Sequence, residues 1–70
     1  MKTNNQVIKE LKAERTEVAS RLGKLNAFGT TSQFEALSVV QRSLIQKQSA
    51  AMNTYVWALN ERIRDLEADK

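Results

Sequence analysis

The chain of 70 residues contains no cysteine, no histidine and no proline. Without cysteine it has no disulfide and no thiolate ligand, and without histidine it lacks the commonest metal ligand and the commonest general base. Carboxylate dyads and nucleophile–base pairs are missing from the sequence as well. We therefore expect no cofactor and no metal site, and we predict that the protein is not an enzyme.

Glycine and long apolar runs are also scarce. Glycine occurs only at Gly23 and Gly29, and hydrophobic residues make up 41% of the chain against 27% charged residues. This balance is typical neither of a disordered chain nor of a membrane protein. The polar start "MKTNNQ" has no apolar signal core, so a cytoplasmic location without membrane contact is expected.

The short chain predicts one domain over 1–70, and a core of this size is marginal because a small domain buries little surface. With no disulfide or metal to stabilise it, oligomerisation is the remaining source of buried area. The formal net charge of +3 permits an anionic partner but does not demand one.

Helix-start signals divide the chain into three segments. A hydroxyl residue stands three positions before Gln or Glu at 3–6, 32–35 and 38–41, which is the pattern of a capping box. The spacing predicts a helix over about 4–27, a connection with a short helix over 28–38 and a helix over about 39–68. The short connection makes the long helices antiparallel, so we predict an all-α two-helix hairpin that assembles into a helical bundle.

The first long helix has one apolar stripe of helical period, whereas the second has two stripes about a quarter turn apart. The stripe of the first helix is Val7, Ile8, Leu11, Val18, Leu22 and Leu25. The main stripe of the second helix is Val40, Leu44, Gln48, Ala51, Tyr55, Leu59, Arg62 and Leu66. We expect this stripe to face the first helix, with Leu22 near Leu44, Val18 near Gln48, Arg15 near Ala51 and Leu11 near Tyr55. Gly29 is expected to cap the first helix in a left-handed conformation.

The second stripe of the second helix is Ile45, Met52, Val56 and Ile63. One helix can cover only one stripe, and exposed apolar patches usually mark interfaces. These four residues are therefore predicted to form an oligomer interface, in a dimer with a four-helix bundle or in a higher assembly. The alternative is a monomer with an apolar surface.

Polar residues interrupt the stripes that are expected to face each other. Gln41, Gln48, Tyr55 and Arg62 recur every seven residues, and Arg15 interrupts the stripe of the first helix. One interpretation is a polar layer that fixes register and oligomeric state. The other is a ligand pocket in which Arg15, Tyr55 and Arg62 contact an anionic or nucleotide-like molecule.

The connection offers a second candidate anion site. Lys24 and Arg42 flank the hydroxyl residues Thr30, Thr31 and Ser38. Free N–H groups and the macrodipole favour anions at helix N-termini, so a phosphate-bearing ligand is one interpretation. Ordinary helix capping by these residues is the other.

Trp57 is the only tryptophan, and it lies off both apolar stripes beside Asn53, Asn60 and Arg64. Tryptophan and arginine dominate interface hot spots, so this face is predicted to bind a protein partner. Two alternatives are a third subunit that covers Trp57 and a nucleotide base that stacks on it.

One pattern resembles a family of small, mostly uncharacterised tailed-phage proteins of helical-hairpin type. It comprises "RLGKLNAF" at 21–28, then Phe34, Leu37, Gln41, Leu44, Gln48, Ala51-Met52, Tyr55, Leu59 and Arg62-Ile63. The resemblance implies a phage or prophage accessory protein, located in the host cell cytoplasm, and it brings no catalytic residues. Small phage accessory proteins often act against host defence, by blocking an immune protein or by sequestering a nucleotide signal.

Together these observations predict a non-catalytic binding protein that self-associates. Its partners would be copies of itself and either a host immune protein or an anionic nucleotide-like ligand. The alternative function is that of a small basic nucleic-acid-binding helical protein, which the dispersed lysine and arginine residues support less well.

Overall fold

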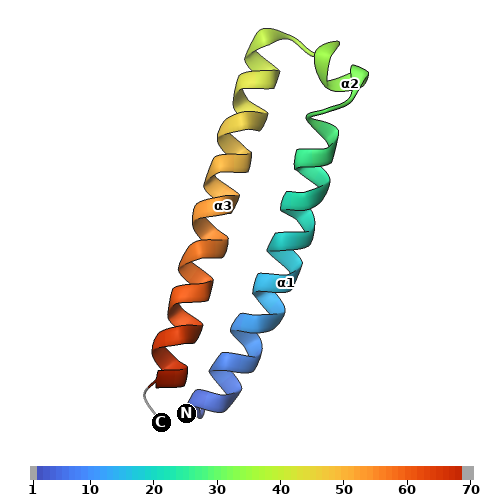
Figure 1. Cartoon of the computed structure of the whole chain (residues 1–70). Coiled ribbons are helices and arrows are strands. Elements are labelled where there is room, and N and C mark those ends of the chain that lie inside the picture. The colour runs from blue at the N-terminus through green and yellow to red at the C-terminus, as the bar shows by residue number, and fades with distance from the viewer. Residues whose placement is uncertain (1, 69–70) are drawn as a thin grey trace.

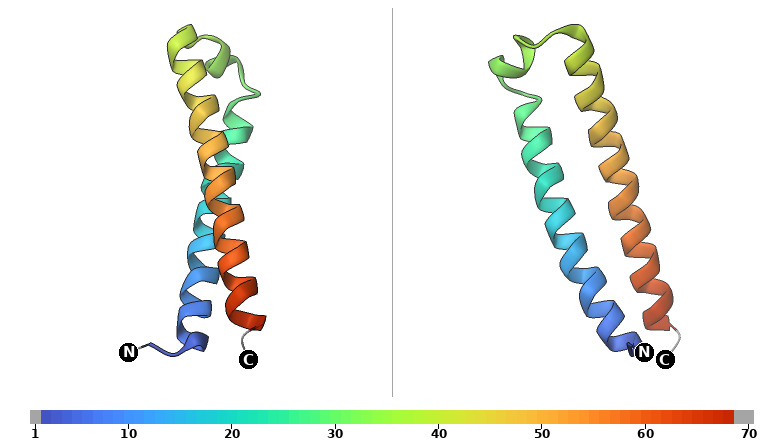
Figure 2. Two further views of the ribbon diagram at one scale, coloured as in Figure 1. Left: turned by 90° about the vertical axis from the view of Figure 1, so that its left-hand side faces the viewer. Right: turned by 180° about the vertical axis from the view of Figure 1, so that it is seen from behind.

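The computed structural model describes residues 2–68, which form a hairpin of two long helices with a short helix at the connection (Figure 1). The helices are α1 (Asn4–Phe28), α2 (Ser32–Glu35) and α3 (Val39–Ala68). No strand occurs among the described residues, so the prediction of an all-α hairpin is confirmed. The molecule is narrow, with extents of 50 × 19 × 14 Å. The two long helices lie side by side in Figure 1 and in the right view of Figure 2, and they overlap in its left view.

The start of α1 is fixed by the predicted capping box. The backbone N–H of Gln6 donates to Thr3 Oγ1 at 3.2 Å, and the backbone N–H of Thr3 donates to Gln6 Oε1 at 2.9 Å. Two donors that the helix leaves unpaired are thus satisfied reciprocally. The predicted stripe of α1 is the buried one: Ile8, Leu11, Val18 and Leu22 are buried, and Val7 and Leu25 are half-buried.

The connection closes the upper end of the hairpin through aromatic packing. Phe34 of α2 is buried and meets Phe28, the last residue of α1, edge to face with ring centroids 6.0 Å apart. The cap of α2 is Thr31, whose Oγ1 accepts from the Phe34 N–H, and not the predicted Ser32. Gly29 has φ −62°, so the expected left-handed cap is wrong; a Cβ there would lie 3.3 Å from the Asn26 carbonyl oxygen.

The buried core lies toward the termini. Ile8 and Leu11 of α1 pack with Leu59 and Ile63 of α3, and Leu59 is only 2% exposed. In α3, residues 39–58 contain no buried side chain, although the structure describes all of them. The lower half of α3 is therefore anchored in the core, and its upper half is only partly covered.

α1 packs against the second predicted stripe of α3 together with Leu59 and Leu66, which belong to the predicted main stripe. Two members of the predicted oligomer interface show this most clearly: Ile63 is 3% exposed in the core, and Met52 borders α1. The other two, Ile45 and Val56, are half-buried on the same face. α1 therefore covers much of this face in the single chain, and the part of these residues in an interface between subunits stays a prediction. We call these residues, with Ser49, Leu59 and Leu66, the packed stripe.

The predicted main stripe is instead largely open to solvent. Val40, Leu44 and Tyr55 are 66%, 51% and 45% exposed. The open stripe, as we call it, comprises Val40, Leu44, Gln48, Ala51, Tyr55 and Arg62, all of which are exposed. The chain thus keeps a surplus apolar stripe, as expected, but about a quarter turn around α3 from the predicted position.

The register between α1 and α3 also differs from the prediction. Ser49 donates to Asn26 Oδ1 at 2.7 Å, and Arg15 donates to Asn60 Oδ1 at 2.9 Å, whereas Arg15 was expected beside Ala51. The first turns of α3 rise beyond the end of α1, and α2 lies beside them (Figure 1). This offset arises because the connecting residues continue beyond the end of α1 before α3 begins.

Candidate functional site

An open groove of about 590 Å³ runs between α1 and α3 on one side of the hairpin. The upper part of α1 supplies one wall, and the middle of α3 supplies the other. Its lining residues are Val18, Arg21, Lys24, Leu25, Phe28, Gln48, Met52 and Tyr55. The groove exists because the helices are only partly packed above the core, so side chains there leave space between them.

The lining combines an apolar floor with positive charge. Phe28 and Tyr55 contribute aromatic rings from opposite helices, and Arg21 and Lys24 contribute two cations from α1. No carboxylate lines the groove, although Arg21 pairs with Glu17 at 2.6 Å across one turn. Both side chains of that pair are more than half exposed, so the pair is weak and the guanidinium is available to an anion. Flat rings beside cations suit a ligand with an aromatic base and a phosphate.

The structure brings together only part of the predicted anion site. Lys24 and Tyr55 share the groove, together with Gln48. Arg15 is bonded to Asn60 on the other side of the hairpin, and Arg62 is exposed on α3 outside the groove lining. The structure therefore does not bring Arg15 and Arg62 together with Tyr55 in one groove.

The hydroxyl residues of the connection serve as caps. Thr30 Oγ1 donates to the Ala27 carbonyl at 2.8 Å, and Ser38 Oγ accepts from the Gln41 N–H at 3.1 Å. Thr31 caps α2 and also donates to the Phe28 carbonyl. Arg42 lies half-buried in the first turn of α3, outside the groove lining. Their geometry matches helix capping rather than a phosphate cradle.

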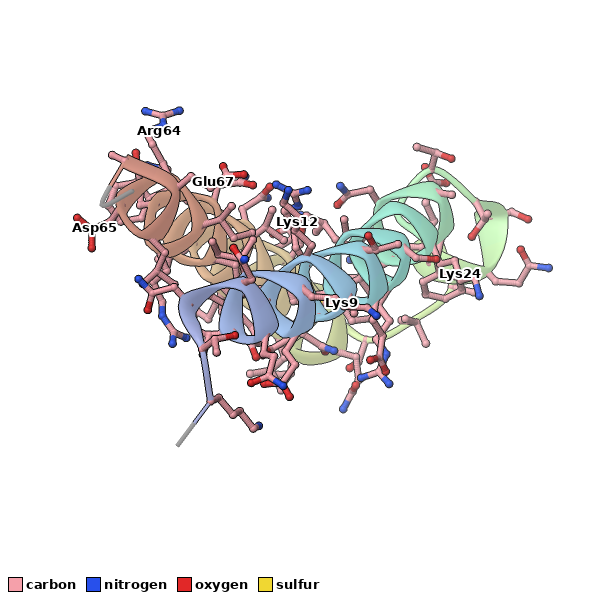
Figure 3. All side chains as sticks on the ribbon, turned by 90° about the horizontal axis from the view of Figure 1, so that it is seen from below. Lys9, Lys12, Lys24, Arg64, Asp65 and Glu67 are labelled. Carbon is pink, nitrogen blue, oxygen red and sulfur yellow. The ribbon has the colours of Figure 1, made fainter. Side chains whose placement is uncertain are left out.

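The Trp57 face lies along α3 away from the groove. Trp57 is 62% exposed, and Arg64 beside it is exposed and points away from α1 (Figure 3). Asn53 is exposed too, and its amide donates to the Ser49 carbonyl at 3.2 Å. Asn60 differs, because it is half-buried and accepts a hydrogen bond from Arg15. The face therefore presents Trp57, Asn53 and Arg64, whereas Asn60 links the two long helices.

Two groove residues escaped the sequence reasoning. Arg21 and Phe28 were not among the predicted anion contacts, yet they line the groove beside Lys24. They stand seven residues apart, so they share one side of α1, and this spacing was a usable signal.

Two further kinds of site were sought in the described part of the chain. Within residues 2–68, no group of three or more carboxylates is placed to hold a metal ion. None of the helices in this range is long and apolar enough to cross a membrane.

The family model described as Sequestin matches residues 5–65, a range that includes nearly all of both long helices and the whole connection. The chain belongs to the Sequestin family. No curated protein and no solved structure shows a significant match. The name Sequestin accords with a protein that binds a partner or ligand rather than transforming it. Every residue lining the groove lies within the matched range.

Proposed function

We propose that this Sequestin-family chain is a phage-type accessory protein that self-associates and sequesters an anionic, nucleotide-like signal of host immunity. The observation that carries the proposal is the groove, in which Tyr55 and Phe28 lie beside Arg21 and Lys24 with no carboxylate in the lining. Aromatic rings stack on a base, and the cations pair with phosphate. The phage origin rests on the sequence resemblance.

Sequestration requires tight binding without turnover. A binder lowers the free concentration of a signal only when its own sites outnumber the signal and hold it with a dissociation constant below the signalling concentration. A small, rigid helical hairpin suits this role because its groove is preformed and little ordering accompanies binding.

Isothermal titration calorimetry with a panel of linear and cyclic nucleotides tests the proposal. The expected result is saturable binding, with each nucleotide recovered chemically unchanged after release by heat. Absence of binding across the panel would overturn the sequestration function. A recovered nucleotide that had been hydrolysed would overturn its non-catalytic character.

Salt dependence separates this function from nucleic-acid binding. Binding of a small ligand in the groove engages few phosphates, so its affinity falls gently with salt, whereas a nucleic-acid binder loses affinity steeply. Four of the cations, Lys2, Lys12, Arg21 and Arg64, are in ion pairs with glutamates. The positive charges are therefore spread along the chain and partly neutralised rather than gathered in one basic stripe, which favours the binding of a small ligand over the binding of nucleic acid.

Trp57 supports a second candidate, the inhibition of a host immune protein. Its indole is 62% exposed on a face that is separate from the groove. An exposed tryptophan beside arginine is a common hot spot of protein interfaces. Co-purification from host cells, compared between the parent chain and Trp57→Ala, tests this candidate; retention of the same host protein by the variant would contradict it.

A further inference from the structure

The open stripe has the spacing of a second helical seam on α3. Five of its members, Leu44, Gln48, Ala51, Tyr55 and Arg62, together with the half-buried Ala58, follow one another at alternating intervals of four and three residues. This is the spacing of a coiled-coil seam. The packed stripe has the same spacing and is covered by α1, whereas Leu44 and Tyr55 are 51% and 45% exposed. A seam of this spacing with Leu44 and Tyr55 exposed, on so thin a molecule, is typical of an interface.

We propose that the open stripe is covered by the open stripe of a second copy of this chain, with the two α3 helices antiparallel about a twofold axis. The inference rests on the self-association in the proposed function and adds to it a face and an orientation. A twofold interface uses the same patch on both copies, so the patch must complement itself. The charges along α3 determine in which orientation of the two helices the patch complements itself.

The flank of the open stripe carries Lys47, Thr54 and Glu61, one every seven residues. In an antiparallel pair the two flanks meet in reverse order, so Lys47 faces Glu61 of the second copy and Thr54 faces its own counterpart. In a parallel pair the upper ends of the two α3 helices would lie side by side. Each upper end carries Arg42 and Lys47 and no acidic residue, so like charges would meet. Charge complementarity therefore favours the antiparallel arrangement.

The lower end of α3 fits this arrangement as well. Asp65 and Glu67 follow Glu61 there, and Asp65 points away from α1 in Figure 3. Glu61 is paired only weakly within the chain, to Arg64 at 3.6 Å with an arginine side chain that is 78% exposed. Its carboxylate is therefore free to face a lysine of the second copy.

The same register gives complementary side-chain sizes. When Lys47 is opposite Glu61, Tyr55 lies against Ala51 of the second copy, whose small side chain covers one edge of the ring and leaves the side that lines the groove open to a ligand. Leu44 lies against the aliphatic stem of Arg62, whose guanidinium reaches solvent. Residues 40–62 extend about 33 Å along the helix, so the seam runs through most of α3.

Disulfide trapping tests this orientation cleanly, because the natural chain has no cysteine. Leu44→Cys and Arg62→Cys are made singly and together, and the oxidised proteins are compared on a non-reducing gel. A disulfide needs Cα atoms within about 7 Å, so only residues that meet across the interface are trapped. The pair Gln48→Cys and Ala58→Cys repeats the test if loss of Leu44 weakens association.

The expected result is conversion of most of the double variant to a covalent dimer, with neither single variant converted. The matched control is Gln46→Cys with Arg64→Cys, which has the same separation along α3 on its other side and should stay monomeric on the gel. Covalent dimers of the single variants would show a parallel pair and overturn the orientation. No covalent dimer from either test pair, or a monomer by sedimentation, would overturn the interface itself. Nucleotide binding by such a monomer would leave the sequestration function standing.

Discussion

Arg15 of α1 and Asn60 of α3 are joined across the hairpin by a hydrogen bond of 2.9 Å from the guanidinium Nη1 to the amide Oδ1. Both side chains are half-buried at the edge of the core. The bond lies beside the core residues Leu11, Leu59 and Ile63. Together with the Ser49–Asn26 hydrogen bond, it is a specific polar contact that favours one register of α1 against α3. Apolar stripes alone tolerate sliding, because one leucine replaces another at the next turn.

Loss of the Arg15–Asn60 bond should destabilise the hairpin modestly. A double-mutant cycle with Arg15→Ala and Asn60→Ala is expected to give a coupling of about 1 kcal/mol in the free energy of unfolding. Urea denaturation followed by circular dichroism measures it. The exposed pair Arg64 and Glu61 provides the control cycle, with an expected coupling near zero. Equal coupling in both cycles would contradict a structural role for the Arg15–Asn60 bond.

The two stripes of α3 should respond differently to truncation. Ile63→Ala removes a core side chain and should cost about 3 kcal/mol, enough to unfold much of a marginal hairpin. Ile63→Val should lower the free energy of unfolding by only about 1 kcal/mol, so this variant stays folded and can be compared with the parent chain. At protein concentrations too low for self-association, Leu44→Ala should leave the unfolding free energy almost unchanged. A Leu44→Ala chain as unstable as Ile63→Ala under those conditions would show that the stripes are assigned wrongly.

Lys24 should contribute directly to ligand affinity. Lys24→Gln removes one cation from the groove, and the nucleotide that binds the parent chain is expected to bind about tenfold more weakly in calorimetry, the loss of one charge-assisted hydrogen bond. Lys9→Gln is the matched control, because Lys9 is exposed on α1 outside the groove (Figure 3). Equal weakening by both variants would indicate general electrostatic attraction rather than a contact in the groove.

Trp57 should behave as a surface residue of the isolated chain. Trp57→Ala is expected to change the free energy of unfolding by less than about 0.5 kcal/mol, because the indole is 62% exposed. As the only tryptophan, it also reports on its own surroundings through fluorescence. Free accessibility to iodide quenching is expected for the chain alone, and protection is expected when a host protein covers this face. Protection in the purified chain would instead indicate that another subunit lies over it.

Most of the fold could be predicted from local signals. The capping box of Thr3 and Gln6, the spacing of Ile8, Leu11, Val18 and Leu22, and the start of α3 after Ser38 are short-range features. They depend on residues three or four positions apart, which a helix brings together whatever the rest of the chain does. The exposure of Trp57 followed in the same way from its position off both apolar stripes of α3.

The candidate site was less predictable. Lys24 and Tyr55 were both proposed as anion contacts, but the sequence grouped them with Arg15 and Arg62. Those groupings assumed that the two helices end level and that the main stripe of α3 faces α1. The groove residues Arg21 and Phe28 were missed because a groove is formed by space between side chains of two helices, which neither helix encodes alone.

What the sequence alone determined is therefore the helices, their faces and the surplus of one apolar stripe on α3. Which stripe is buried was decided only in the tertiary structure. The two stripes have the same helical period and lie a quarter turn apart, so periodicity alone does not say which of them α1 covers, although burial favours the packed stripe because the open stripe contains Gln48 and Arg62. Packing between the two helices decides between them, because Leu59 and Ile63 meet Ile8 and Leu11 of α1 in the core. Ile63 is therefore buried, and Tyr55 lies beside the groove.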